Sequence, residues 1–467
     1  MIINSFEFFW IFPLIFLFYV TLLSWHKGSS GRLANVFILV ASYLLFWHYN
    51  QAMTLVLLAV TLVTWCGALA VRRYDRKKVI VITVALLALL PLLMLKYYPF
   101  INQNLGLLTG ARDGEGALPG LNLAIPLGIS FFTLQAIGYF FDVARKKVEA
   151  ERNLADYMLF VAFFPQIASG PISKASDLLP QIKKRREFNY DQATQGLKWL
   201  LWGMFLKVVV ADNIGEMIAQ PLADSASYSR PTLILSMLLY SVQIYGDFAG
   251  YSFMALGIGQ LLGFELINNF QRPYLSASVT EFWHRWHRSL SIWLKDNIYI
   301  PLGGSRCGKI RNSVNIFATF LVSGLWHGAN WNFVLWGGIH GAAQVVEKRT
   351  GFQDATGNHP AVRALRVLLT FCIVTLAWLF FLQPSAGAAC TTLGHIISPA
   401  GKKALDFTFP LILTAIVIAK DIIDEYAPRL RPLHASSVIV RWTTYSALIF
   451  MIMVFAVYGE KFIYAGF

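Results

Sequence analysis

The chain carries little charge. Of its 467 residues, only 14% are Asp, Glu, Lys or Arg, whereas a typical soluble domain has about a quarter. Acidic residues are the scarcer kind, with 25 Asp and Glu against 39 Lys and Arg. This composition argues against a soluble globular protein.

Cysteine is scarce as well. The four cysteines are far apart and show neither a C-x-x-C motif nor any other metal-type spacing. We interpret them as small apolar packing residues, and we expect no metal site and no bound cofactor. They are Cys66, Cys307, Cys372 and Cys390.

The chain has long apolar runs instead. Hydrophobic residues make up 56% of it, and several runs reach the roughly 20 residues that a helix needs to cross about 30 Å of hydrocarbon. We predict an all-α polytopic membrane protein with about eleven or twelve crossings plus re-entrant segments. The first run, residues 6–25, lacks a basic n-region and a small-residue cleavage site, so it is expected to remain as a spanning helix.

The positions of the basic residues predict the orientation. The net charge of +14 needs no nucleic-acid partner, because Lys and Arg lie in short loops between apolar runs, as the positive-inside rule requires. Basic clusters at residues 72–78, 145–152 and 272–311 are assigned to the cytoplasm. Both termini are then extracytoplasmic, and the expected location is the bacterial cytoplasmic (inner) membrane.

Two apolar segments do not fit a single crossing. Residues 157–170 contain Pro165 and have basic clusters on both sides, which favours a re-entrant or interfacial element. Residues 314–326 and 331–346 are each short and also lie between basic flanks. We predict that they form a hairpin of two half-length helices, with residues 327–330 at its tip.

Histidines are the main candidates for chemistry at membrane depth. Five of the nine are expected in loops or at helix ends, where solvated or interfacial histidines are common: His26, His48, His359, His395 and His434. Four remain, namely His284, His287, His327 and His340. Ionisable residues inside the membrane are costly and therefore indicate function.

His284 and His287 lie in an aromatic and basic segment, Thr280–Pro301. Its tryptophans recur at three- and four-residue spacing with Arg285, Arg288 and Lys295 between them, which predicts an amphipathic helix at the cytoplasmic interface. An interfacial anchor without chemistry explains the pattern equally well. A metal shared by the two histidines is disfavoured, because no suitably spaced Cys, Asp or Glu completes a tetrahedral set.

His327 lies in a glycine-flanked tip between the two hairpin runs. A neutral imidazole there could act as a general base toward a hydroxyl or a thiol. A core histidine bonded to a backbone carbonyl and a proton-relay residue of a transporter remain equal alternatives. His340 is interpreted as a polar packing residue.

The sequence resembles the membrane-bound O-acyltransferase family, and within it the branch of bacterial alginate and peptidoglycan O-acetyltransferases. The resemblance covers most of the chain and rests on long, ordered motifs. They are Arg272-Pro273-Tyr274, Glu281-Phe282-Trp283, Arg285-Trp286-His287, Ser289-Leu290-Ser291, Tyr299 to Gly304, Gly324-Leu325-Trp326-His327-Gly328, Ile125 to Phe131, Phe164-Pro165-Gln166 with Ser169-Gly170-Pro171, and Asp247-Phe248 with Gly250-Tyr251-Ser252.

The resemblance implies two catalytic residues, because the signature histidines of the family fall on His287 and His327. It also implies a funnel-shaped helical fold, formed by residues 1–467 as one domain, with acetyl-CoA as the cytoplasmic donor. Three positions depart from the branch: His284 replaces a frequent Arg, Phe253 replaces Asp, and the tail, residues 462–467, has Ala-Gly where aromatic and polar residues are common. The basic residues expected at the donor phosphates are Arg285, Arg288, Lys295, Arg306 and Lys309.

The expected activity is transfer of acetyl groups across the membrane to an extracytoplasmic polysaccharide. Alginate, cellulose, another exopolysaccharide and peptidoglycan all fit, with a periplasmic acetyltransferase as the expected partner protein. The alternative is a transporter of an acyl group or a lipid-linked sugar with His327 as proton relay. Such carriers have intramembrane carboxylates, whereas Asp247 is nearly alone here, which favours the enzyme.

The predicted orientation can be tested with Cys307, which lies in the basic stretch 272–311. With Cys66, Cys372 and Cys390 replaced, an impermeant thiol reagent is expected to label Cys307 in inside-out vesicles and to leave it unlabelled in intact spheroplasts. Labelling from outside would reverse the orientation.

Overall fold

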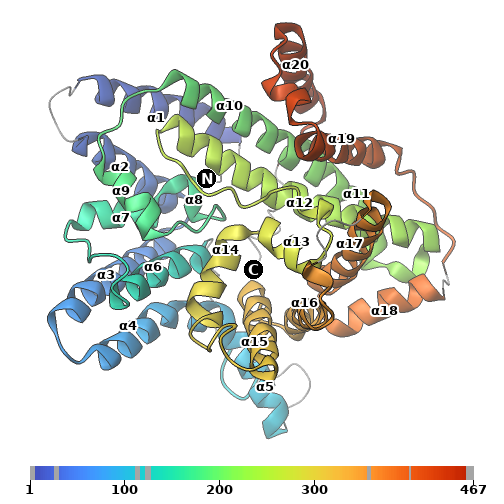
Figure 1. Ribbon diagram of the computed structural model, residues 1–467, viewed down its shortest axis with the longest axis horizontal. Coiled ribbons are helices and arrows are strands. Elements are labelled where there is room, and N and C mark those ends of the chain that lie inside the picture. Colours follow the sequence, from blue (N-terminus) through green and yellow to red (C-terminus); the bar gives the residue numbers. More distant parts are fainter. Residues whose placement is uncertain are drawn as a thin grey trace. The chain divides into compact units, whose positions relative to one another are not determined.

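The computed structural model describes residues 6–25, 31–110, 116–120, 128–354, 359–398 and 401–458. These residues form helices and connecting turns and, within the described ranges, no strand (Figure 1). The prediction of an all-α protein is confirmed. His26, residues 125–127 of the Ile125–Phe131 motif and the tail at 462–467 lie outside the described residues.

Within the described residues, five helices are long and apolar enough to cross a membrane. They are α3 (Gln51–Arg73), the continuous helical stretch Lys77–Thr109 that contains α4 (Lys77–Leu92) and α5 (Tyr98–Thr109), α12 (Arg230–Leu261), α17 (Pro360–Leu382) and α20 (Val438–Phe455). Shorter apolar helical stretches cover Trp10–Ser24, Arg32–His48, Ile129–Ala144 and Ala386–Ile397. The chain is a membrane protein, as its apolar runs indicate.

The chain divides into two compact units. The first contains residues 1–200 and 254–267, and the second contains residues 201–253 and 268–463. Helices α10 (Tyr190–Met204) and α12 contribute residues to both units. Whether the whole chain acts as one domain stays a prediction.

The first unit holds the remaining helices of the N-terminal half. They are α1 (Phe6–Trp25), α2 (Arg32–Tyr49), α6 (Ile129–Ala144), α7 (Leu154–Ala162), α8 (Phe164–Ile167) and α9 (Ala175–Lys183). The segment predicted to be re-entrant forms α7 and α8, which are separated at Phe163 and are almost entirely buried within this unit. Its backbone is therefore enclosed by protein, which is the condition for irregular structure at membrane depth.

The second unit carries all the residues of the candidate site. Its further helices are α11 (Asp212–Ala223), α13 (Val279–Arg285), α14 (Arg288–Leu294), α15 (Lys309–His327), α16 (Trp331–Thr350), α18 (Ala386–Ile397) and α19 (Thr408–Tyr426). This unit has two π-helical segments among its described residues: Phe205–Ala211 joins α10 to α11, and Lys295–Tyr299 extends α14. Such segments occur often at functional sites.

The predicted hairpin is present, but its helices are longer than expected. α15 has 19 residues and α16 has 20, which corresponds to about 28 and 30 Å at 1.5 Å per residue. The added turns are polar, from Lys309 to Ser313 and from Glu347 to Thr350. The prediction of half-length helices is therefore wrong, since apolar length alone does not show where a helix ends.

Two glycines allow α15 and α16 to pack backbone against backbone. A Cβ on Gly324 would lie 2.2 Å from the Phe333 carbonyl oxygen, and one on Gly337 would lie 2.3 Å from the Phe320 carbonyl oxygen. The two glycine Cα atoms are close neighbours across the interface. Small residues at such crossings are how membrane helices approach closely.

The segment Thr280–Pro301 does not form the single helix predicted for it. α13 ends at Arg285, α14 begins at Arg288, and His287 between them adopts a left-handed conformation with φ 44°. His284 and His287 therefore do not share one face of a helix: His284 is exposed, whereas His287 is buried. Helical periodicity cannot show this break.

The tight hairpin predicts that Gly324→Ala destabilises the protein by about 1–3 kcal/mol through overpacking. The apparent Tm of the detergent-purified protein is the measurement. Gly338→Ala is the matched control on the same hairpin, because the atoms nearest to its new Cβ are side-chain atoms 3.8 Å away. Equal Tm values for the two variants would contradict the packing argument.

Candidate functional site

The turn at His287 is held from both sides by backbone hydrogen bonds. The Trp286 amide donates to the Phe282 carbonyl at 2.7 Å and closes α13. On the other side, the Arg288 amide donates to the Asn269 carbonyl at 3.2 Å, and the Ser289 amide donates to Asn269 Oδ1 at 3.0 Å. A left-handed conformation at a non-glycine residue persists only where its surroundings fix it.

This turn buries the His287 side chain completely. Its ring lies edge-on to Phe248 of α12 at 4.7 Å between centroids, and 5.9 Å from Trp326. Burial lowers the pKa of the His287 imidazole, so the ring is neutral at physiological pH. A neutral imidazole can accept a proton or donate a hydrogen bond.

His327, the last residue of α15, meets His287 across the core of the second unit. The two ring centroids are 6.5 Å apart, and His327 is 1% exposed. Trp336 at 4.9 Å and Phe381 at 5.3 Å cover the His327 ring. The structure therefore brings together, in an apolar enclosure, the two histidines that the family resemblance assigns to catalysis.

The hairpin tip near His327 is tied to the end of α17. Asn332 Nδ2 donates to the Gln383 carbonyl at 2.7 Å and to the Phe380 carbonyl at 3.1 Å. Gln383 Nε2 in turn donates to the Leu222 carbonyl at 2.8 Å. These bonds fix the backbone around His327 without using its imidazole.

α16 also positions α13, which leads to His287. Glu347 accepts hydrogen bonds from the amides of Val279 at 2.5 Å and Thr280 at 2.9 Å, so it caps the first turn of α13. A second contact joins the same two helices: Trp283 Nε1 of α13 donates to His340 Nδ1 of α16 at 3.3 Å. This contact agrees with the interpretation of His340 as a polar packing residue.

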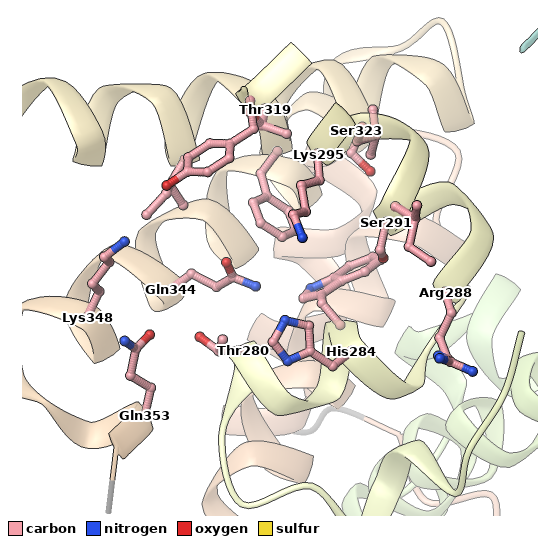
Figure 2. A pocket seen from close by; sticks show the side chains of 16 residues that line it. Thr280, His284, Arg288, Ser291, Lys295, Thr319, Ser323, Gln344, Lys348 and Gln353 are labelled. Atoms are coloured by element: carbon pink, nitrogen blue, oxygen red, sulfur yellow. The ribbon is translucent and has the colours of Figure 1, made fainter. Parts of the chain in front are cut away.

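A pocket of about 610 Å³ lies next to α14 and α15, and neither His287 nor His327 is among its lining residues (Figure 2). It is lined by α13, α14, α15, α16 and the segments next to them. Three cationic side chains face it, and among the described lining residues there is no carboxylate. The lining residues used below are Arg288, Lys295, Lys348, Ser291, Thr319 and Ser323.

The five predicted donor-binding residues separate in the structure. Arg288 and Lys295 line the pocket, as does His284, whose pKa is lowered by burial and by Lys295. Arg306 lies in the loop before α15, and Lys309 is the first residue of α15. Both are exposed, and neither lines the pocket.

Arg285 is engaged elsewhere. Its guanidinium forms ion pairs with Glu281 at 2.7 Å and with Glu425 at 2.9 Å. Arg272 pairs with the same Glu425 at 2.6 Å. Burial would raise the pKa of Glu425, but the two guanidiniums hold it below its ordinary value. Arg285 therefore joins α13 to α19 and does not line the pocket. Lys348, which was not predicted, is the third cation of the pocket lining.

A buried ion cluster is a further feature that sequence reasoning missed. Lys207, in the π-helical segment, pairs with Asp212 at 2.6 Å and with Asp247 at 2.7 Å, and its side chain is 0% exposed. Asp247 precedes Phe248, the residue that contacts His287. Lys207, deep within the apolar run 196–211, was the available signal, since such a charge requires a buried partner.

Residues 42–383 match the model of MBOAT, the membrane-bound O-acyltransferase family. The chain is 33% identical to a probable alginate O-acetylase of Pseudomonas syringae pv. tomato, over 82% of this chain and 74% of that protein. It is 34% identical to a peptidoglycan O-acetyltransferase of Helicobacter pylori, over 66% of this chain and 62% of that protein. A teichoic acid D-alanyltransferase of Streptococcus thermophilus is 30% identical, over 72% of this chain and 83% of that protein.

The ion cluster predicts an order of effects among its variants. Lys207→Met leaves two buried carboxylates without their cation and is expected to destabilise the protein by about 3–5 kcal/mol. Asp212→Asn leaves the Lys207–Asp247 pair in place and is expected to cost less. Apparent Tm and membrane abundance measure both, and the reverse order would show that Lys207 is not the centre of the cluster.

Proposed function

Because this chain belongs to the membrane-bound O-acyltransferase family, we propose that it transfers acetyl groups from cytoplasmic acetyl-CoA to an extracytoplasmic polysaccharide. The observation that carries the proposal is the buried pair His287 and His327, 6.5 Å apart, beside a cationic pocket. The enzyme is an acyltransferase by family; the donor, the acceptor and the residue roles are the proposal.

The pocket combines positive charge with an apolar lining, which suits a donor that carries phosphate groups on an otherwise neutral chain. Arg288, Lys295 and Lys348 supply positive charge for phosphates. Its volume of about 610 Å³ is in the range of small-molecule sites, which are about 300–1,000 Å³. Aromatic and aliphatic residues of α13 and α15 complete the lining.

The proposed reaction is a direct acyl transfer. His327 accepts the proton of the acceptor hydroxyl while the oxygen attacks the thioester carbon, so that a C–O bond forms and the C–S bond breaks. The proton passes to the departing thiolate, which leaves as the thiol of CoA. His287, neutral in its apolar surroundings, orients the thioester and donates a hydrogen bond to the leaving sulfur or the carbonyl oxygen.

The acceptor is proposed to be a polysaccharide on the outer side of the cytoplasmic membrane. Relatives named for alginate and peptidoglycan O-acetylation, at 33% and 34% identity, support acetyl as the acyl group over the D-alanyl group of the 30% relative. The positive-inside rule supports a cytoplasmic pocket and extracytoplasmic termini. We propose a periplasmic acetyltransferase as the partner protein.

A transporter with His327 as proton relay is disfavoured by the ion cluster. The intramembrane Asp247 carboxylate contacts the Lys207 ammonium at 2.7 Å and is thus part of a buried ion pair. A relay residue must instead gain and lose its proton during each cycle. Asp247 therefore has a structural role in this proposal, as the partner of Lys207.

His327→Ala is expected to reduce polymer acetylation by about 10²- to 10⁴-fold, the usual loss for a general base. His287→Ala is expected to reduce it as well but not to eliminate it, and His284→Ala is expected to be mild. Label transfer from [acetyl-¹⁴C]acetyl-CoA to the polymer, normalised to protein in the membrane, is the measurement.

His434→Ala is the control for loss of an imidazole, because His434 is exposed in a short helical turn. Near-normal acetylation by His327→Ala would remove the base assignment. A larger loss in His284→Ala than in His287→Ala would show that the family positions do not transfer to this chain.

A further inference from the structure

Two serine hydroxyls line the pocket without a protein partner. Ser323 on α15 is 0% exposed, and Ser291 on α14 is half-buried. Among the residues that the structure describes, neither hydroxyl has a hydrogen-bond partner, although both side chains face the pocket. Buried polar groups are nearly always hydrogen-bonded, so each such exception requires a physical reason.

Helix geometry alone does not explain why these hydroxyls lack a hydrogen-bond partner among the described residues. A helical serine or threonine can return its hydrogen bond to the carbonyl four residues earlier. Thr319, one turn before Ser323 and lining the same pocket, does so, because its Oγ1 donates to the Asn315 carbonyl at 2.7 Å. Ser323 has no such bond and keeps its hydroxyl available to a ligand in the pocket.

The two serines also share a relation to the histidines. Ser323 is four residues before His327 on α15, and Ser291 is four residues after His287, whose carbonyl accepts a 3.1 Å hydrogen bond from the Ser291 amide. Four residues correspond to about 6 Å along a helix, and residues at this spacing share one helix face. Ser323 is therefore one helical turn from His327 on α15, and Ser291 is one turn into α14 from His287, the residue that precedes this helix.

The cations are distributed along the pocket. Figure 2 shows Lys348 and Gln353 on one side of the view and Ser291, Ser323 and Arg288 on the other, with Lys295 and Gln344 between them. Lys348 thus lies apart from the two hydroxyls, whereas Arg288 lies on their side. An extended ligand with phosphates toward Lys348 and neutral amide and thioester groups toward the serines fits this order.

We propose that Ser291 and Ser323 are donor-binding residues that hydrogen-bond the neutral arm of the acyl donor and place its thioester next to His287 and His327. The inference rests on the proposed function and deepens it, because it names the groups that hold the reacting end of the donor. The serines donate to carbonyl oxygens of the arm and form no covalent bond with it.

Alanine substitution tests this role kinetically. Ser323→Ala and Ser291→Ala are each expected to raise the KM for acetyl-CoA about 3- to 10-fold, the range for one hydrogen bond, and to leave kcat within about twofold. Ser323→Thr, which keeps the hydroxyl, is expected to retain most of the donor affinity. A fall in kcat at unchanged KM would overturn the binding role.

Ser236→Ala is the matched control. Ser236 on α12 is also 0% exposed, and its hydroxyl has no hydrogen-bond partner among the described residues, but it does not line the pocket. Its KM and kcat are expected to equal those of the parent protein. A rise in its KM equal to that of Ser323→Ala would show that loss of any buried hydroxyl has this effect, and the assignment would fail.

A labelling experiment tests binding without turnover. With Cys66, Cys307, Cys372 and Cys390 replaced, Ser323→Cys is expected to react with a small membrane-permeant thiol reagent, whereas Ser236→Cys is not. A thioether analogue of acetyl-CoA is expected to slow the reaction at position 323 at least fivefold. Adenosine 3′,5′-bisphosphate, which lacks the arm, is expected to leave it unchanged.

The outcomes separate this inference from the proposed function. Equal labelling with and without the analogue, in a protein that still transfers acetyl groups from acetyl-CoA, overturns the serine assignment alone. Equal protection by the bisphosphate overturns the placement of the arm. Failure of the parent protein to use acetyl-CoA overturns the proposed function itself.

Discussion

The left-handed turn at His287 is the constraint on which the rest of the site depends. It ends one short helix and starts another, and this change of direction moves the imidazole into the core while His284 stays exposed. The conformation is unfavourable for a residue with a Cβ, so neighbouring groups must hold it. Asn269 does so directly on the α14 side, and Glu347 of α16 fixes the start of α13.

The hairpin of α15 and α16 supplies the other half of the site. Gly324 and Gly337 let the two backbones approach closely, and this approach places Trp336 of α16 against His327 of α15. The same helix α16 carries Glu347 at its other end. One close-packed helix pair therefore positions both histidines, which explains how residues 40 positions apart in the chain can form a pair.

Charged groups in this membrane protein are divided by role. Lys207, Asp212 and Asp247 compensate one another within the core beside Phe248, and Arg285 and Arg272 share Glu425. The cations at the pocket have no carboxylate among the described lining residues, so their charge is available to an anionic ligand. Around the two histidines, aromatic rings take the place of charged groups.

Local features of the sequence were enough to predict the membrane class, the all-α fold and a hairpin, because apolar run length and loop charge are properties of neighbouring residues. The family resemblance, carried by ordered motifs, singled out His287 and His327 as candidates. Only the tertiary structure decided the break at His287, the full length of the hairpin helices and the separation of His284 from His287. It alone also paired Arg285 with Glu425, 140 residues away, and Lys207 with Asp247. These features depend on contacts between residues distant in the chain, which local periodicity does not encode.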